Sequence, residues 1–254
     1  MDYQWRALSP SWSNALYWVQ PVGGQAMLLR MHTPGVLSHA RRQQEMAIWH
    51  RAAIEGIAPK LLYVASDGAY CLTEWLEGGH QVMSHLVDMM QQHLLQFHQC
   101  LQPQDEPLDY QASVQTLINQ WQQPRTSRDL MQIDRVMEAA HVLSQTQTPP
   151  VLCHLDLNKR NLLWGKQHCW LLDFEYAACA HPILDVVQLV EQPLLQPVAM
   201  ELVAWYEQRG YAMQSLWDSA SVFHRGLTWL WYEVEAHRRQ DPLYQQQANQ
   251  YKTN

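Results

Sequence analysis

The sequence contains no run of about 18 apolar residues, which is the length a helix needs to cross a membrane. Its first residues lack the apolar core of a signal peptide. The five cysteines form no Cys-x-x-Cys pair, so neither a zinc site nor a disulfide framework is indicated. We therefore expect a cytoplasmic protein without a membrane partner, whose thiols lie buried in a reducing compartment.

Positive charge is scarce as well. Lys and Arg together number 17 against 24 for Asp and Glu, which gives a formal net charge of −7. An acidic chain is repelled by polyanions, so we expect no nucleic acid partner. The same charge favours a cationic small molecule as ligand, and a solvated acidic surface explains it equally well.

The most informative segment places polar residues around two short apolar runs. It contains the pattern His-x-Asp-x-x-x-x-Asn, formed by His154, Asp156 and Asn161, and then Asp-Phe-Glu beginning at Asp173. In ATP-dependent kinases such a pattern supports phosphoryl transfer, because the loop Asp accepts the proton of the attacking hydroxyl while the Asn and the second Asp hold Mg2+. We thus expect Asp156 and His154 to be catalytic and Asn161 and Asp173 to bind metal. His154 is expected to brace the loop by hydrogen bonds rather than to transfer protons.

The apolar runs at 162–164 and 169–172 indicate two paired strands with a hairpin between them. That hairpin would return Asp173 to the side of Asn161. The alternative is a buried hairpin whose polar ends serve only as caps.

This segment resembles the aminoglycoside phosphotransferase and choline kinase family, which has the protein-kinase-like fold. Protein kinases typically have Asp-Phe-Gly where this chain has Asp-Phe-Glu, so the resemblance implies a small-molecule acceptor. We also expect Glu175 to add a direct or water-mediated contact to the metal. The stretch from His181 to Asp185 is similar to the family's next element, in which an Asp opens a helix and braces the catalytic loop. Asp185 is equally explained as a helix N-cap.

The resemblance implies an α+β fold with two lobes, a small β-rich N-terminal lobe and a larger, mainly helical C-terminal lobe. We expect a nucleotide-binding lobe over residues 1–76 and a catalytic, acceptor-binding lobe over residues 77–254. The hydrophobic pattern agrees with this order. It predicts a helix over residues 41–54 with Met46, Trp49 and Ala53 on one face. It also predicts two hairpins with strands at 14–19 and 25–30, and at 61–64 and 70–74.

On the nucleotide side the resemblance implies ATP and Mg2+ as cofactors. Asn14 falls in the loop that covers the phosphates, where residues 9–13 replace the usual glycines. Arg30 falls where protein kinases place their phosphate-binding Lys, and its planar fork suits phosphate oxygens. We expect Glu45 to be its ion-pair partner; the alternative is that Arg30 is an exposed strand residue.

The hinge between the lobes is expected at Glu74, Trp75 and Leu76, whose backbone would bind adenine. The acceptor side is expected near Trp229, Tyr232 and Glu233, because aromatic faces and carboxylates attract organic cations. The alternative is that these aromatic residues only pack the last part of the helical lobe.

Within the family, the chain is most similar to bacterial thiamine kinases, through the Leu-Leu-Arg strand ending at Arg30, residues 57–60 and the aromatic segment around Trp231. That similarity implies phosphorylation of thiamine to thiamine monophosphate by a monomer or homodimer. The alternatives are a choline or ethanolamine kinase, an aminoglycoside phosphotransferase, or a nucleotide-binding pseudokinase.

Overall fold

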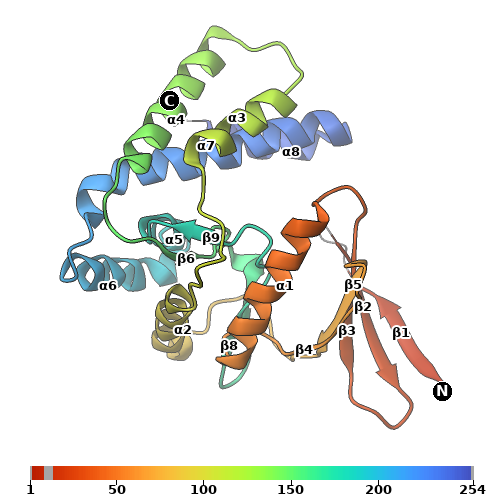
Figure 1. Ribbon diagram of the computed structural model, residues 1–254. Coiled ribbons are helices and arrows are strands. Elements are labelled where there is room, and N and C mark those ends of the chain that lie inside the picture. Colours follow the sequence, from red (N-terminus) through yellow and green to blue (C-terminus); the bar gives the residue numbers. More distant parts are fainter. Residues whose placement is uncertain (1, 9–13, 253–254) are drawn as a thin grey trace. The chain divides into compact units, whose positions relative to one another are not determined.

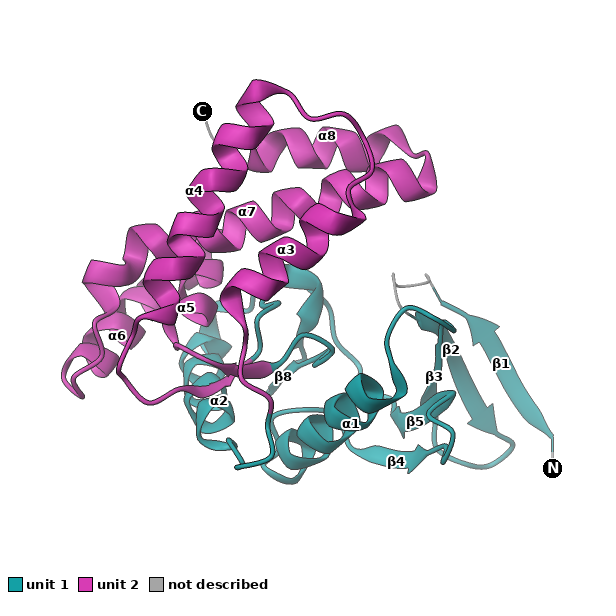
Figure 2. Ribbon diagram, turned by 45° about the horizontal axis from the view of Figure 1, so that its top comes forward, with its two compact units in different colours: residues 1–105, 154–177 teal, residues 106–153, 178–254 magenta. Residues whose placement is uncertain are grey.

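The computed structural model describes residues 2–8 and 14–252. The chain divides into two compact units, and it enters each of them twice (Figure 2). Unit 1 consists of Met1–Asp105 and His154–Ala177, and unit 2 consists of Glu106–Cys153 and Ala178–Asn254. The predicted lobe boundary at residue 76 thus falls within unit 1, and this boundary stays a prediction.

A five-stranded antiparallel sheet with the order β1-β2-β3-β5-β4 begins unit 1. Its strands are β1 (Tyr3–Ala7), β2 (Asn14–Pro21), β3 (Met27–His32), β4 (Leu61–Val64) and β5 (Tyr70–Glu74). Both predicted hairpins are confirmed, and the first one turns through Gly23, whose positive φ of 75° suits glycine. The exposed edge strand β1 was not predicted individually.

Helix α1 (His39–Ile54) follows the first hairpin. The Ser38 hydroxyl caps its start, and Gly56, with φ 74°, follows its end. Met46, Trp49 and Ala53 are buried, as the pattern predicted. The same helix also buries charged side chains in its first two turns, which the apolar pattern did not indicate.

The remainder of unit 1 is formed by η1 (Ser84–Leu86) and α2 (Val87–Gln99), then by η2 (Lys159–Asn161), β7 (Leu162–Trp164) and β8 (Cys169–Leu171). The β7–β8 hairpin is bonded to the N-terminal part of this unit: the Leu171 amide donates to Ile57 O at 2.9 Å, and Gly79 and Trp164 exchange backbone bonds of 2.9 and 2.7 Å. These bonds explain why the hairpin groups with the N-terminal sheet.

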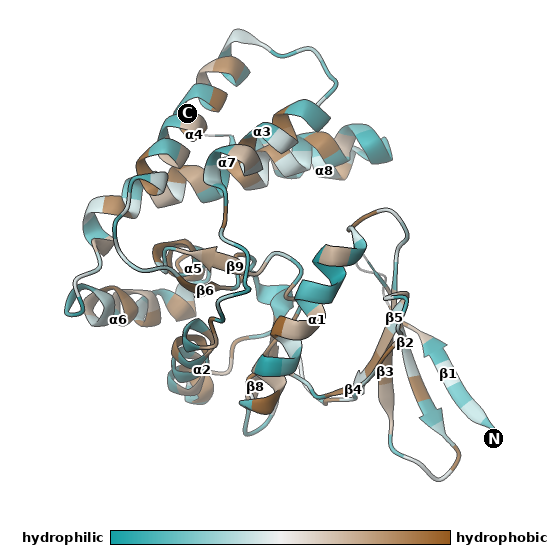
Figure 3. Ribbon diagram, in the orientation of Figure 1, coloured by the Kyte–Doolittle hydropathy of each residue, from teal (hydrophilic) through white to brown (hydrophobic). Residues whose placement is uncertain are grey.

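Unit 2 is mainly helical (Figure 1). Its helices are α3 (Tyr110–Gln120), α4 (Ser127–Ser144), α5 (Ile183–Leu189), η3 (Pro193–Leu195), α6 (Gln196–Glu207), α7 (Met213–Arg239) and α8 (Pro242–Tyr251). The short strands β6 (Val151–Cys153) and β9 (Ala178–Ala180) pair antiparallel. These two strands and α5 are predominantly apolar (Figure 3), and every residue of α5 is buried. The predicted combination of an N-terminal sheet with a mainly helical C-terminal part is confirmed.

None of the described helices combines the length and the apolar character that a membrane span requires.

Helices α4 and α7 approach each other closely at Gly226, which is buried within α7. A Cβ atom built at Gly226 would overlap Val136 Cγ2 and lie 2.8 Å from Val136 Cγ1. The absence of a side chain is therefore what allows Val136 of α4 to pack here.

We expect Gly226→Ala to lower the free energy of unfolding by roughly 1–3 kcal/mol, because overpacking a dense core costs this much and exceeds the gain of about 1 kcal/mol from better helix propensity. Urea unfolding followed by circular dichroism measures it. When Gly226→Ala is introduced into a Val136→Ala protein, the additional loss in the free energy of unfolding should be much smaller. A Gly226→Ala protein as stable as the parent would contradict this account of the α4–α7 contact.

Candidate active site

The carboxylate of Asp156 is held from both sides by amide groups of its own loop. Asn158 Nδ2 donates to Oδ1 at 2.8 Å, and Asn161 Nδ2 donates to Oδ2 at 2.6 Å. Burial raises the pKa of Asp156, and the charge of Asp173 acts in the same direction, against the opposing effects of His154 and the two amides. An oriented carboxylate that is more basic than usual suits the role of proton acceptor.

His154 braces the loop, as predicted from the motif. Its Nδ1 accepts from the Asp156 amide at 3.3 Å, which leaves Nε2 to donate to Leu172 O at 2.9 Å. The imidazole packs against the rings of Phe97 and Phe174. His154 therefore connects the Asp156 loop to the end of the β7–β8 hairpin.

The β7–β8 hairpin returns Asp173 to Asn161, because the Leu172 amide donates to Asn161 O at 2.9 Å. The predicted strand pairing is confirmed by the register Leu162↔Leu171. Leu155 and Asp173 both have φ of 65°, and among the described non-glycine residues only Gln240 shares this region. Backbone held in sparsely populated conformations gathers at functional sites, so these two positions mark the loop independently of the motif.

Arg30 lies at the centre of a buried group of charges, with its side chain 4% exposed. Its Nη1 lies 2.9 Å from Glu45 Oε1, so the predicted ion pair is confirmed and the exposed alternative is wrong. Its Nη2 donates to Asp173 Oδ1 at 2.7 Å. Burial alone would lower the pKa of Arg30, but the carboxylates around it, first Asp173 and then Glu45, raise it above its ordinary value. This guanidinium is therefore always charged.

Sequence reasoning missed two further arginines of α1. Arg42 Nη1 lies 2.7 Å from Glu45 Oε2 and 3.7 Å from Glu175 Oε2. Arg41 donates to Glu175 O at 2.9 Å and to Ala177 O at 3.1 Å. The spacing of Arg42 three residues before Glu45 was the available signal, since such residues are neighbours on a helix. Both arginines attach α1 to the segment after Asp173.

The oxygen groups around the hairpin fit a magnesium ion. Mg2+ prefers a few hard oxygen ligands together with waters and phosphates. The amide nitrogen of Asn161 faces Asp156, which turns its carboxamide oxygen away from Asp156, and the Asp173 side chain is 24% exposed. Glu175 lies against Arg30 and Arg42 instead, so its contact with a metal stays a prediction.

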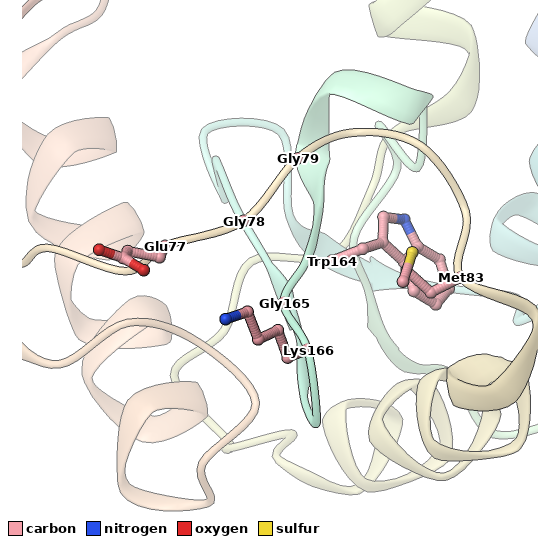
Figure 4. Close-up of a pocket in the computed structure, with 7 residues that line it drawn as sticks. All are labelled: Glu77, Gly78, Gly79, Met83, Trp164, Gly165 and Lys166. Atoms are coloured by element: carbon pink, nitrogen blue, oxygen red, sulfur yellow. The ribbon is translucent and has the colours of Figure 1, made fainter.

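The segment after β5, where the hinge is expected, borders a cavity of about 370 Å³ in unit 1. Figure 4 shows that Trp164, at the end of β7, and the turn residues Gly165 and Lys166 line it together with Glu77, Gly78, Gly79 and Met83. Within the hinge, the Trp75 amide donates to Ala26 O at 3.3 Å, and Glu74 Oε1 accepts from the Lys60 amide at 2.8 Å. Leu76 immediately precedes the cavity residues.

Asn14 is the first residue of β2, opposite His32, and is 2% exposed. The residues of the preceding loop, 9–13, lie outside the described part of the chain. The phosphate-covering role of Asn14 therefore stays a prediction.

Comparison with known proteins agrees with this geometry. The model of a family described as "Phosphotransferase enzyme family" matches residues 4–220. The chain belongs to this family. It is a small-molecule phosphotransferase of the aminoglycoside phosphotransferase and choline kinase type, so the predicted class of enzyme, which phosphorylates a hydroxyl group, is confirmed. No curated protein matches the chain in sequence.

Solved structures of kinases share the fold at low sequence identity, and the predicted protein-kinase-like fold is confirmed. Choline kinase LicA from Streptococcus pneumoniae has a TM-score of 0.76 at 13% identity, with 98% of this chain and 92% of that chain covered. A choline/ethanolamine kinase family protein from Mesorhizobium loti has a TM-score of 0.70 at 17% identity, with 98% and 85% covered. Aminoglycoside 2'-phosphotransferase-IIIa has a TM-score of 0.64 at 15% identity, with 98% and 90% covered.

The predicted acceptor residues of this phosphotransferase lie in α7 of unit 2. Trp229 is fully buried, packs edge-on against Trp121, and donates from its indole nitrogen to Glu233 Oε1 at 3.1 Å. Glu233 also accepts from Gln245 of α8. Tyr232 is half-buried and stacks on Tyr251. Trp229 and Glu233 thus make the contacts of packing residues, and a role for all three in acceptor binding stays a prediction.

Asp185 lies in the first turn of α5, fully buried, and the N-cap of this helix is Pro182. The interpretation of Asp185 as an N-cap is therefore wrong, while its bracing role stays a prediction. His181 binds the start of this helix, because its Nδ1 accepts from the Ile183 amide at 3.2 Å. The His181 amide in turn donates to the Tyr110 hydroxyl at 3.1 Å.

Burial lowers the pKa of His181 to about 4, and that of His224 to about 4 as well. An unfolded histidine titrates near about 6.5, so between these values the unfolded chain binds protons that the folded chain excludes. We expect the free energy of unfolding to fall as the pH drops from about 7 to about 5. Urea unfolding across this range measures the slope.

His181→Asn keeps an acceptor for the Ile183 amide but does not titrate, so this variant should show a shallower pH dependence than the parent. An unchanged slope would show that His181 does not contribute to it.

Proposed function

We propose that the protein is an ATP-dependent kinase that transfers the γ-phosphate to the hydroxyl group of a small cationic alcohol, with thiamine as the first candidate and thiamine monophosphate as product. The observation that carries the kinase assignment is the Asp156 carboxylate, oriented by Asn158 and Asn161 in the same unit as Asp173 and Arg30. A base, two oxygen ligands for a metal and a buried cation together are what phosphoryl transfer requires.

In the proposed mechanism Asp156 orients the acceptor hydroxyl and accepts its proton as the oxygen attacks the γ-phosphate in line. The two asparagine bonds keep the carboxylate aimed while the proton moves. Asn161 and Asp173 would hold Mg2+, which neutralises phosphate charge when it is bound. His154 keeps the loop in its conformation through its bonds to the Asp156 amide and Leu172 O.

Nucleotide binding is supported by related folds. LicA has been solved in complex with AMP, and the 2'-phosphotransferase in complex with GDP. We assign adenine recognition to the backbone of Glu74, Trp75 and Leu76, and phosphate contacts to Asn14 and to the Arg30–Glu45 pair. The choice of ATP over GTP is part of the proposal.

The acceptor proposal rests on charge and aromatic content. The net charge of −7 and the aromatic residues and carboxylates of α7 favour a cation. We place Tyr232 first among the acceptor residues, because Trp229 is fully buried and Glu233 is bonded to Trp229 and Gln245. The similarity of Arg30 and its strand to thiamine kinases favours thiamine.

A second candidate is a choline or ethanolamine kinase, because the structures of LicA and of the Mesorhizobium loti protein carry those names. The structure of APH(2")-IIia was solved in complex with GDP and kanamycin, which makes an aminoglycoside the third candidate. All three acceptors carry positive charge and a hydroxyl group, so one assay distinguishes them.

The test is Mg-ATP turnover by the purified protein with thiamine, choline, ethanolamine and kanamycin, followed by ADP release. We expect saturable turnover with one acceptor, thiamine first. Asp156→Asn should lower kcat by at least about 100-fold, the contribution typical of a positioned general base, while ATP affinity by calorimetry stays within about twofold of the parent.

Asp88→Asn is the matched control, because it makes the same chemical change at an exposed position of α2. It should leave turnover unchanged. Near-normal turnover by Asp156→Asn would contradict the catalytic assignment. ATP binding without turnover of any acceptor would favour a pseudokinase over the proposed enzyme.

A further inference from the structure

Arg30 binds the carboxylate that is proposed to hold the metal. Its Nη2 donates to Asp173 Oδ1 at 2.7 Å, while its Nη1 lies 2.9 Å from Glu45. We propose that Arg30 competes with the metal for the Asp173 carboxylate until a nucleotide binds, so that metal binding is strengthened when Arg30 transfers this bond to a phosphate of the incoming nucleotide. This proposal rests on the metal role of Asp173 in the proposed function.

The contact opposes a metal in two ways. A charge-assisted bond of 2.7 Å to Oδ1 reduces the number of carboxylate lone pairs that would be available to a cation. The guanidinium is also 4% exposed, so water screens its charge poorly and a second cation beside it is repelled. Mg2+ alone should therefore bind weakly to the free enzyme.

Arg30 can release Asp173 without becoming an isolated buried charge. Arg30 Nη1 keeps its ion pair with Glu45. Arg30 Nη2, which would leave Asp173, lies 3.8 Å from Glu175 Oε2. Glu45 and Glu175 are in turn paired with Arg42. Phosphate oxygens match the planar fork of arginine. A phosphate of the nucleotide can therefore accept the hydrogen bond from Nη2 that the Asp173 carboxylate accepts otherwise.

The backbone around Asp173 is also held by contacts that do not involve Arg30. The preceding residue, Leu172, donates its amide hydrogen to Asn161 O and accepts a hydrogen bond from His154 Nε2 at its carbonyl. After Asp173, the fully buried ring of Phe174 packs against Trp49 and Phe97. Removing the guanidinium should thus uncover the carboxylate rather than displace it.

The experiment is a titration of the purified protein with Mn2+ followed by electron paramagnetic resonance, with and without a non-hydrolysable ATP analogue. We expect Arg30→Gln to bind Mn2+ about tenfold more tightly than the parent without nucleotide, a factor equal to about 1.4 kcal/mol, and to bind the analogue more weakly. A purely structural role for Arg30 predicts the opposite change in metal affinity. In the parent, the analogue should tighten Mn2+ binding.

Arg30→Lys serves as a second variant, because it keeps the buried charge and loses the fork that spans Glu45 and Asp173. It should also bind Mn2+ more tightly than the parent, by a smaller factor. Thermal unfolding establishes that each variant is folded at the temperature of the titration.

Arg42→Gln is the matched control, since it removes the same charge from the same cluster without touching Asp173. Equal Mn2+ affinity in parent and both Arg30 variants, or an equal gain in Arg42→Gln, would overturn the inference. A different result bears on the proposed function itself: if Asp173→Asn binds Mn2+ with nucleotide as well as the parent does, Asp173 is not a metal ligand.

Discussion

The buried contact between Arg30 and three carboxylates organises unit 1. Glu45 comes from α1, Asp173 and Glu175 come from the segment after β8, and Arg30 comes from the middle of the sheet. Charges this deep are costly to leave unpaired, because the loss of one partner strands the others without water. Sheet, helix and hairpin must therefore meet at one point for any of these charges to be tolerated.

Helix α1 consequently does more than cover the sheet. Its apolar face places Trp49 against Phe174, while Arg41 holds the carbonyls of Glu175 and Ala177. A displacement of the helix would pull on the backbone on the far side of Asp173. The position of α1 and the conformation of the proposed metal loop are thus coupled through direct bonds within one compact unit.

Much of this arrangement could be predicted from the sequence. The short apolar runs on either side of Gly165 indicated the hairpin, because such runs determine strand pairing locally. The partner of Arg30 was also predicted, because Arg30 falls where protein kinases place their phosphate-binding Lys and Glu45 lies on the next helix.

Other contacts could not be predicted, because they join residues distant in sequence without a periodic pattern. Arg41 binds carbonyl oxygens, which carry no side-chain signal, and the contact of Arg42 with Glu175 joins residues that lie far apart in the sequence. The aromatic content of α7 gave no indication that the Trp229 indole nitrogen is bonded to Glu233. Burial in a helical unit depends on which faces meet, and composition alone does not determine that.

The pairing of β6 with β9 has a consequence for the order of synthesis. Cys153 is paired with Ala178, so residues 154–177 leave unit 2 at one strand and rejoin it at the adjacent one. On the ribosome, the N-terminal sheet and α1 emerge long before Asp173 and Glu175. Of the three carboxylates that surround Arg30 in the folded unit, only Glu45 is therefore available to the nascent chain until the second passage through unit 1 is complete.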